Sequence, residues 1–340
     1  MVKNKMIIFI LIMAAIAILA FSGLQKTPKE QNGHPLSGLP MKIAGAYWPG
    51  SFWVLIAEKK GWFKEAGLNV EVIFTDTDYF VSLDNMVEGR MDQNNFSLFD
   101  YIIYLSQNRD LVFILNPDNS SGVEAIVARP GIETIHELKG KKIAVALGTY
   151  LEYELDIFLE NQGLSSREVI KVNMHAEKMV RAFAENKVDA IITWEPFVSE
   201  AVEKEKGIKL IDTSQIPGMS PNGNVFHRRF IQERPGDVQA YVRVWHKTTQ
   251  FIKENPDPAF TIIANMYNKT IQEVQTIAQL DKLLDLQDNL TAFSYGSGLN
   301  SLHGSWKQMN NFMAKKKVIE KRLKSIDYLD SSWIRNLDQP

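Results

Sequence analysis

AYWPGSFWVLIAEKKGWFKEAGLNVEVIF, residues 46–74, contains a polar-tipped helix between two apolar strand-like runs. The run 42–47 predicts a strand, and a Pro-Gly pair then separates it from a predicted helix at 51–60. The apolar run 68–74 predicts the next strand. A strand, a helix and a strand within so short a stretch are typical of a parallel-sheet α/β protein.

The same alternation continues over most of the chain. Further strands are predicted at 91–96, 111–116, 123–129, 142–147, 169–173, 188–193, 208–212 and 224–229. Further helices are predicted at 79–88, 98–108, 149–162, 175–186 and 195–206. From Pro235 onward the pattern is mainly helical. The sequence therefore predicts an α/β fold with a helical C-terminal segment.

Composition excludes several classes of function. The 340 residues suffice for two domains, and 45% apolar with 23% charged residues is typical of a globular protein. A net charge of −2 gives no basic face for nucleic acid. The absence of Cys excludes disulfides and thiolate chemistry, and the six His residues show no metal-binding spacing. We therefore expect no metal, no cofactor and no catalytic residues.

The N-terminus has the pattern of an export signal. Lys3 and Lys5 precede an apolar run at 6–21, which is short for a membrane-spanning helix. We expect residues 1–22 to be a signal peptide cleaved before Gly23, although an uncleaved anchor remains the alternative. Residues 23–40, rich in Pro, Gly, Lys and Gln, are then a flexible leader. Both alternatives place the rest of the chain outside the cytoplasmic membrane, in the periplasm.

Aromatic and polar side chains follow the predicted strands. In α/β sheets, ligands bind beside the carboxyl ends of the strands, where these tips converge. The tips read AYWPGS (46–51), TDTDY (75–79), FSLFD (96–100), NPDNSSG (116–122), LGTYLE (147–152) and TWEPF (193–197), and they contain no Lys or Arg. The candidate ligand-binding residues are Tyr47, Trp48, Ser97, Asp118, Ser120, Ser121, Thr149, Tyr150, Trp194 and Glu195.

Local roles remain open for several of these candidates. Thr149 has capping-box spacing to Glu152, so both side chains can serve the start of their own helix. Glu195 suits the N-terminus of the following helix, and Trp194 can cap the core. Asp118 and the serines after it can form a turn in their loop. Each of these positions therefore has both a structural and a ligand-binding interpretation.

Three segments resemble solute-binding proteins of nitrate, sulfonate and thiamine-precursor ABC importers. The first is residues 46–74, with Gly61-Trp62-Phe63 and Gly67-Leu68-Asn69-Val70 at the family's motif positions. The second, residues 118–164, runs DNSSGVEAIVARPGIETIHELKGKKIAVALGTYLEYELDIFLENQGL, and the third is VDAIITWEP at 188–196. The segments occur in the family order and extend over roughly residues 41–330.

The resemblance implies a two-lobed periplasmic-binding-protein type II (Venus flytrap) fold with two crossover strands. Lobe 1 is then 41–128 plus 229–330, and lobe 2 is 129–228, with crossings near Ala128-Arg129 and His227-Arg228. The implied function is capture of a small polar organic solute in the interlobe cleft and its delivery to an ABC permease, by a monomer that catalyses no reaction. Alternatives are a ligand-sensing partner of a membrane receptor, or an enzyme such as a thiamine-pyrimidine synthase. The enzyme is disfavoured because its cysteine-rich motif has no counterpart here.

The chemistry of the tips favours one class of solute. Tyr47, Trp48, Tyr79, Tyr150 and Trp194 supply aromatic walls, carboxylates stand beside them, and no basic residue is present. An amine or a nitrogen heterocycle suits such a site better than a sulfonate or nitrate, for which Arg or Lys would normally provide donors.

Overall fold

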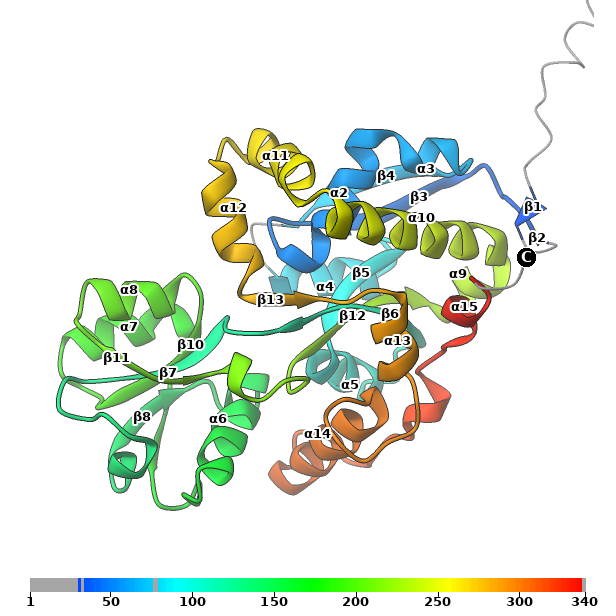
Figure 1. Ribbon diagram of the computed structural model, residues 1–340. Coiled ribbons are helices and arrows are strands. Elements are labelled where there is room, and N and C mark those ends of the chain that lie inside the picture. The colour runs from blue at the N-terminus through cyan, green and yellow to red at the C-terminus, as the bar shows by residue number, and fades with distance from the viewer. Residues whose placement is uncertain (1–29, 32–33, 76–78, 338–340) are drawn as a thin grey trace, which may run out of the picture.

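The computed structural model describes residues 30–31, 34–75 and 79–337; the expected signal peptide and half of the expected leader lie outside this part of the chain. The described residues form two α/β lobes joined by two chain crossings (Figure 1). A short pair of strands, β1 (Glu30–Gln31) and β2 (His34–Pro35), precedes the first lobe. The two-lobed fold predicted from the sequence is confirmed.

The sheet of lobe 1 has the strand order β13-β6-β12-β5-β3-β4 within the described residues. Its strands are β3 (Pro40–Gly45), β4 (Asn69–Phe74), β5 (Gln93–Ser97), β6 (Leu111–Ser120), β12 (Pro221–His227) and β13 (Asp281–Leu283). β3 is parallel to β4 and β5, whereas β12 and β13 run antiparallel to their neighbours. The predicted strand–helix–strand unit is present over residues 40–74, with its first strand ending at Gly45.

The sheet of lobe 2 has the order β11-β7-β10-β8-β9 within the same described ranges. Its strands are β7 (Glu124–Ala128), β8 (Lys142–Val145), β9 (Ile170–Asn173), β10 (Ala190–Trp194) and β11 (Ile208–Asp212). β8 is parallel to β9 and β10, and β7 is antiparallel to β10 and β11. Both sheets are therefore mixed rather than parallel, because β7 and β12, the strands that follow the two crossings, and β13 run against the remaining strands.

Helices cover both sheets. In lobe 1 they are α2 (Pro49–Lys60), α3 (Trp62–Glu65), α4 (Tyr79–Val87) and α5 (Leu98–Ser106); in lobe 2 they are η1 (Ile135–Leu138), α6 (Tyr150–Asn161), α7 (Ala176–Ala184), α8 (Phe197–Glu203) and η2 (Thr213–Gln215). The C-terminal segment adds α9 (Arg228–Glu233), α10 (Pro235–Glu254), α11 (Pro256–Tyr267), α12 (Ile271–Ala278), α13 (Leu286–Ala292), α14 (Leu302–Lys316), η3 (Ser325–Asp327) and α15 (Ser332–Arg335). α10 packs against α2, so the C-terminal helices return to lobe 1 (Figure 1). None of the helices in the described ranges has the length and apolar character needed to span a membrane.

The crossings lie earlier than the predicted boundaries. β6 belongs to the sheet of lobe 1 and β7 to that of lobe 2, so the chain crosses between Ser120 and Glu124 rather than at Ala128-Arg129. It returns between Asp212 and Pro221, not at His227-Arg228. The sequence-based boundaries were placed at the far ends of β7 and β12, whereas each of these strands pairs with a single lobe along its whole length.

The predicted loop NPDNSSG is mostly strand. β6 continues to Ser120, where it pairs with β12 on one side and β13 on the other. Asp118 and Ser120 therefore project from a strand, not from a turn. Asn, Pro and Asp are poor strand formers, and here the partners on both sides hold them extended.

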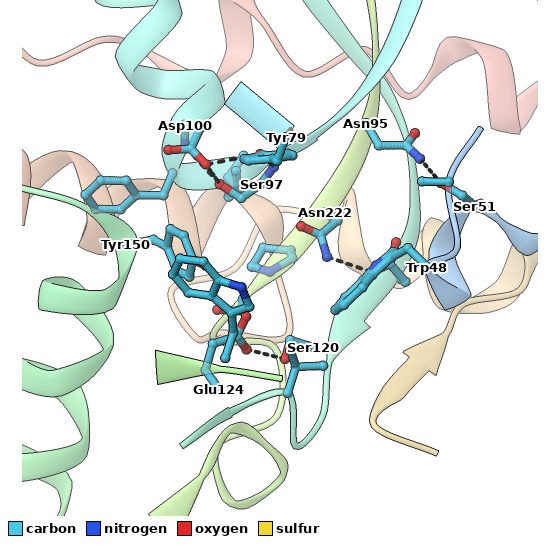
Figure 2. Close-up of a pocket in the computed structure, with 18 of the residues that line it drawn as sticks. Trp48, Ser51, Tyr79, Asn95, Ser97, Asp100, Ser120, Glu124, Tyr150 and Asn222 are labelled. Carbon is cyan, nitrogen blue, oxygen red and sulfur yellow. Dashed lines mark hydrogen bonds between the residues drawn. The ribbon is translucent and has the colours of Figure 1, made fainter. Parts of the chain in front are cut away.

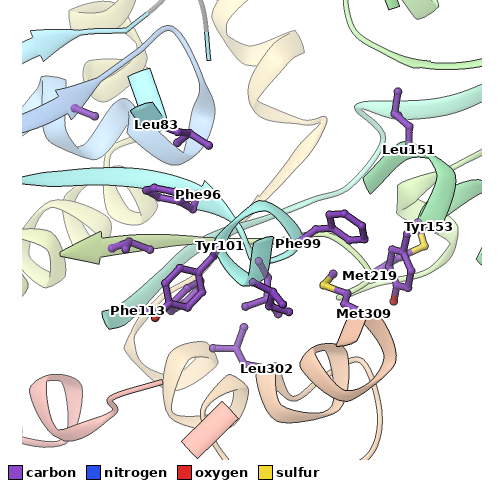
Figure 3. Close-up of a cluster of buried hydrophobic side chains, with 14 of the residues drawn as sticks. Leu83, Phe96, Phe99, Tyr101, Phe113, Leu151, Tyr153, Met219, Leu302 and Met309 are labelled. Atoms are coloured by element: carbon purple, nitrogen blue, oxygen red, sulfur yellow. The ribbon is translucent and has the colours of Figure 1, made fainter. Parts of the chain in front are cut away.

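The apolar core continues from lobe 1 toward lobe 2. Phe99 on α5 lies 5.9 Å, between ring centroids, from Tyr153 on α6, and Phe312 on α14 lies 5.5 Å from Tyr153. Figure 3 shows Phe99 and Met309 between the lobe 1 core and Tyr153. Aromatic contacts therefore join α14 to α6 across the lobes.

A charged network reinforces this contact. On α6, Glu152 and Asp156 share two ammonium groups, from Lys171 of lobe 2 and from Lys316 at the end of α14. Glu152 Oε1 lies 3.0 Å from Lys171 Nζ, and Asp156 Oδ2 lies 3.4 Å from Lys316 Nζ. The two carboxylates are only 6% and 10% exposed, so they depend on both lysines for neutralisation.

Lys316→Met is expected to destabilise the protein by about 1–3 kcal/mol, because one ammonium group would remain for two buried carboxylates. Urea unfolding measures the change. Lys315→Met, at an exposed position on the same turn, serves as the matched control and should have little effect. Equal stability of the two variants would contradict a stabilising role for the interlobe network.

Candidate ligand-binding site

A cavity of about 650 Å³ lies where the lobes meet beside the crossings. Lobe 1 contributes residues after β3 and β5, the crossing strands contribute β6 and β12, and lobe 2 contributes α6 and the end of β10 (Figure 2). Carboxyl ends of parallel strands and helix starts converge here, as expected for an α/β fold. Its walls carry both aromatic and polar side chains.

Trp48 and Asn222 both donate to one carboxylate in the wall. Trp48 Nε1 lies 3.4 Å and Asn222 Nδ2 lies 2.6 Å from Asp118 Oδ2, and Asp118 is buried. A Cβ at Gly50 would stand 1.9 Å from Asp118 Oδ1, so only glycine lets the first turn of α2 approach so closely. Burial raises the pKa of Asp118, and it raises that of the neighbouring Asp281 well above the usual range, further helped by Asp118.

A second carboxylate stands at the start of α5. Ser97 Oγ donates to Asp100 Oδ2 at 2.6 Å, and Tyr79 Oη donates to the same oxygen at 3.1 Å. Ser97 also caps the helix, because its hydroxyl accepts the Asp100 N–H at 3.0 Å. Burial raises the pKa of Asp100 to about 6, against the opposing effect of these hydrogen bonds.

A third carboxylate, Glu124, enters from the first residue of β7. Ser120 Oγ donates to Glu124 Oε2 at 2.5 Å and lies 2.9 Å from Thr213 Oγ1. Burial raises the pKa of Glu124 to about 7, and the nearby Asp118 carboxyl acts in the same direction. Behind it, Glu154 is fully buried and accepts from Ser220 Oγ. Burial, with Glu124 nearby, raises the pKa of Glu154 well above its usual range.

An aromatic wall covers the lobe 2 side. Tyr150 and Trp194 have ring centroids 6.2 Å apart at 36°, and Phe197 meets Trp194 edge-on at 5.9 Å. Figure 2 shows Tyr150 above Glu124 on this side. Burial and the surrounding carboxylates raise the pKa of Tyr150 well above its usual range, so it stays neutral. A flat solute can stack against this wall.

Eight of the ten predicted residues line the cavity among the described residues. They are Tyr47, Trp48, Ser97, Asp118, Ser120, Tyr150, Trp194 and Glu195. Ser121 and Thr149 are not part of the lining. Thr149 Oγ1 accepts the Leu151 N–H at 3.2 Å and donates to Ala146 O, so it serves the start of α6. Ser121 follows the end of β6, and its N–H donates to Leu280 O.

Glu195 reaches the cavity but its carboxylate is already engaged. Ser199 N–H donates to Oε2 at 3.1 Å, and Ser199 Oγ donates to Oε1 at 3.0 Å. The carboxylate therefore stabilises the first turn of α8.

The sequence did not identify Glu124, Asn222, Asp100 or Tyr153 as candidates, although all four line the cavity. Asp100 is the last residue of the tip FSLFD, and its position three residues after Ser97, in the first turn of a predicted helix, is the signal that could have identified it. Glu124 stood at the start of a predicted strand, where a carboxylate is usually exposed. Nothing local indicates that its side chain turns into the cleft.

The lining residues in the described ranges include no Lys, Arg or His. The start of α6 also gives little to an anion, since Gly148 N–H already donates to Glu152 Oε2 at 2.9 Å. Within the described part of the chain, no group of three or more His, Cys, Asp or Glu is placed to hold a metal ion. The described lining therefore offers hydrogen-bond acceptors and aromatic faces to a ligand, and no cationic side chain.

Comparison with known proteins gives a family match and two informative relatives. The profile of the family described as "NMT1/THI5 like" matches residues 48–259. An aliphatic sulfonates-binding protein of Bacillus subtilis (strain 168), so described by its name, is 25% identical over 83% of this chain and 83% of its own. The taurine-binding periplasmic protein of Escherichia coli (strain K12) is 24% identical over 72% of each chain.

Solved structures share the fold at low identity. The alkanesulfonate-binding protein SsuA from Xanthomonas axonopodis pv. citri, bound to MOPS, matches with a TM-score of 0.64 and 14% identity over 86% of this chain and 98% of its own. The desulfurization enzyme DszB matches with a TM-score of 0.61 and 14% identity over 87% and 98%. The fold is therefore found in binding proteins and in an enzyme.

The uncompensated carboxyls predict an unusual pH dependence of stability. Asp100 and Glu124 have raised pKa values in the folded protein, so folding retains protons that the unfolded chain releases near pH 4. Their stabilisation is complete below that pH and is lost as pH rises through about 6 and about 7. The ligand-free protein should therefore be more stable at pH 5.5 than at pH 8, with a slope approaching roughly 1 kcal/mol per pH unit for each released proton.

Urea unfolding at several pH values measures this slope. Glu124→Gln and Asp100→Asn should each make it shallower, because each removes one titrating group. A free energy of unfolding that rises from pH 5.5 to pH 8 in the unsubstituted protein would contradict the prediction.

Proposed function

The chain belongs to the NMT1/THI5-like family, and from this membership we propose that it is an extracytoplasmic solute-binding protein that delivers a small polar organic solute to an ABC import permease. The observation that carries the proposal is the cavity between the lobes, lined from both of them beside the crossings. Its volume and mixed aromatic and polar lining suit a small molecule. Closure of the lobes about the crossings would enclose the solute.

The proposed location is the periplasm. One relative is named a periplasmic protein, and both relatives reported above are named binding proteins. An ABC permease in the inner membrane is then the partner that receives the solute.

We propose binding without catalysis. The fold alone does not decide this, since DszB shares it. The chain has no Cys, which removes both a thiol nucleophile and the motif of a thiamine-pyrimidine synthase. The hydroxyls of Ser97 and Ser120 donate to carboxylates, with no His among the described lining residues to activate them.

The proposed solute is an amine or a nitrogen heterocycle. The named relatives bind sulfonates and taurine, yet this cavity presents the carboxyls of Asp100, Asp118, Glu124 and Glu195. A sulfonate or nitrate would meet these groups without an Arg or Lys among the described lining residues to offset them. An amine is attracted by the same carboxyls and by the faces of Trp194 and Tyr150.

A thermal-shift panel tests the proposal with ethanesulfonate, nitrate, benzylamine and 4-aminopyrimidine. We expect benzylamine or 4-aminopyrimidine to raise the melting temperature, because a ligand that binds only the folded state stabilises it by about 2.7 kcal/mol at a hundred times its Kd. Stabilisation by ethanesulfonate or nitrate alone would overturn the proposed charge preference.

Trp48→Ala and Trp194→Ala should each weaken binding of the stabilising compound at least about tenfold, because an aromatic wall contributes roughly 1–3 kcal/mol in a desolvated site. Calorimetry measures the affinity, and thermal melts show whether the variants fold. Trp62→Ala is the matched control, since Trp62 packs on Phe251 and does not line the cavity. Unchanged affinity in both cavity variants would mean that these rings serve packing only.

A further inference from the structure

We propose that Glu124 sets the charge preference of the site by binding an ammonium group that carries at least one N–H, against the ring of Trp194. The inference rests on the proposed solute-binding function and narrows its solute class to protonated primary or secondary amines.

Strand register places the two side chains together. In the antiparallel pair of β7 and β10, Glu124 is directly opposite Trp194. Directly opposed residues point to the same face of a sheet, with Cβ atoms about 4.5–5.5 Å apart. Both residues line the cavity, and Tyr150 packs on Trp194. A cation held by Glu124 therefore also lies within reach of an aromatic face.

Position separates Glu124 from the other three cavity carboxylates, because it alone among them stands opposite Trp194 in the sheet. Glu195 already accepts from Ser199 through both of its oxygens. Asp118 accepts two hydrogen bonds at Oδ2, and its Oδ1 faces Gly50. Asp100 accepts from two hydroxyls. Glu124 accepts from the hydroxyls of Ser120 and Thr213, has no cationic partner among the described residues, and stands opposite Trp194.

A buried hydroxyl in the cavity wall has no partner within the described ranges. The Tyr153 hydroxyl lines the cavity, is 1% exposed and has no hydrogen-bond partner within the described ranges. A buried polar group of this kind is costly unless it is satisfied. A head group that carries N–H can donate to this hydroxyl oxygen, whereas a quaternary ammonium has no N–H to donate.

The charged groups around Glu124 in the described part of the chain are all acidic, so each of them favours the protonated form of Glu124. Among the described residues, the titratable groups that interact with Glu124 are the carboxyls of Asp118 on β6, Glu154 on α6 and Asp281 on β13, together with the neutral Tyr150 on α6. With the pKa of Glu124 raised to about 7, a bound cation displaces a proton from this residue. Affinity for an ammonium should therefore rise about tenfold per pH unit below pH 7 and level off above it. A neutral heterocycle that accepts a hydrogen bond from protonated Glu124 would show the opposite trend.

The test compares four probes built on one ring: benzylamine, benzyltrimethylammonium, benzyl alcohol and benzenesulfonate. Calorimetry at pH 6, 7 and 8 is done on the full chain and on Glu124→Gln, which keeps the shape and an acceptor for Ser120. We expect benzylamine to bind most tightly, with affinity rising with pH. In Glu124→Gln its affinity should fall at least about tenfold, and its pH dependence should flatten.

Two further variants separate the possible outcomes. Glu200→Gln is the matched control, because its carboxylate, on α8, pairs with Lys204 and does not line the cavity, and it should leave benzylamine affinity within about twofold. Asp100→Asn tests the rival carboxyl. Loss of benzylamine binding in Asp100→Asn but not in Glu124→Gln, or failure of benzylamine to bind at all, overturns this inference. Binding of benzenesulfonate alone would, in addition, overturn the charge preference in the proposed function.

Discussion

The hydroxyl of Thr213 ties the two chain crossings to each other. It accepts the N–H of Gly122 at 2.7 Å from one crossing and lies 2.9 Å from the Ser120 hydroxyl, while Thr213 itself begins the return crossing. Ser120 in turn donates to Glu124, so a continuous chain of hydrogen bonds connects the two crossings to the cavity wall. Ser120 and Thr213 are buried, so losing one of these hydrogen bonds is costly, and the bonds hold the crossings in register. The cavity lies beside the crossings because both lobes contribute residues there.

Helix α6 separates two electrostatic environments. Glu152 and Asp156 lie on one face, where Lys171 and Lys316 neutralise them and join α14 to lobe 2. Tyr150 and Glu154, four residues apart, lie on another face, toward the cavity and the crossings. Basic residues therefore stabilise the contact between the lobes and leave the cavity carboxyls uncompensated. Such a cavity is costly to keep ionised when empty, which links proton binding to the occupancy of the site.

The relatives share this architecture but are named for sulfonates and taurine. A fold conserved at 14% identity, as with the solved structures, constrains the sheets and crossings far more than the side chains that face the cleft. Here Gly148 N–H already donates to Glu152, so a helix start suited to an anion is partly occupied by the protein's own carboxylate.

The sequence by itself determined the elements of the fold. All ten predicted strands and six predicted helices between residues 42 and 229 are present, because apolar periodicity reflects which face of each element is buried. The sequence also placed ten candidate residues at strand tips, and eight of them line the cavity, because the tips of parallel strands converge where the strands end. Tertiary structure alone decided that Asp118 and Ser120 lie on a strand, because partners on both sides outweigh the weak strand propensity of Asn116–Asp118. It also decided that Glu195 caps a helix while Glu124 faces the cleft, since the second outcome depends on the register of β7 against β10, a long-range pairing that no local pattern encodes.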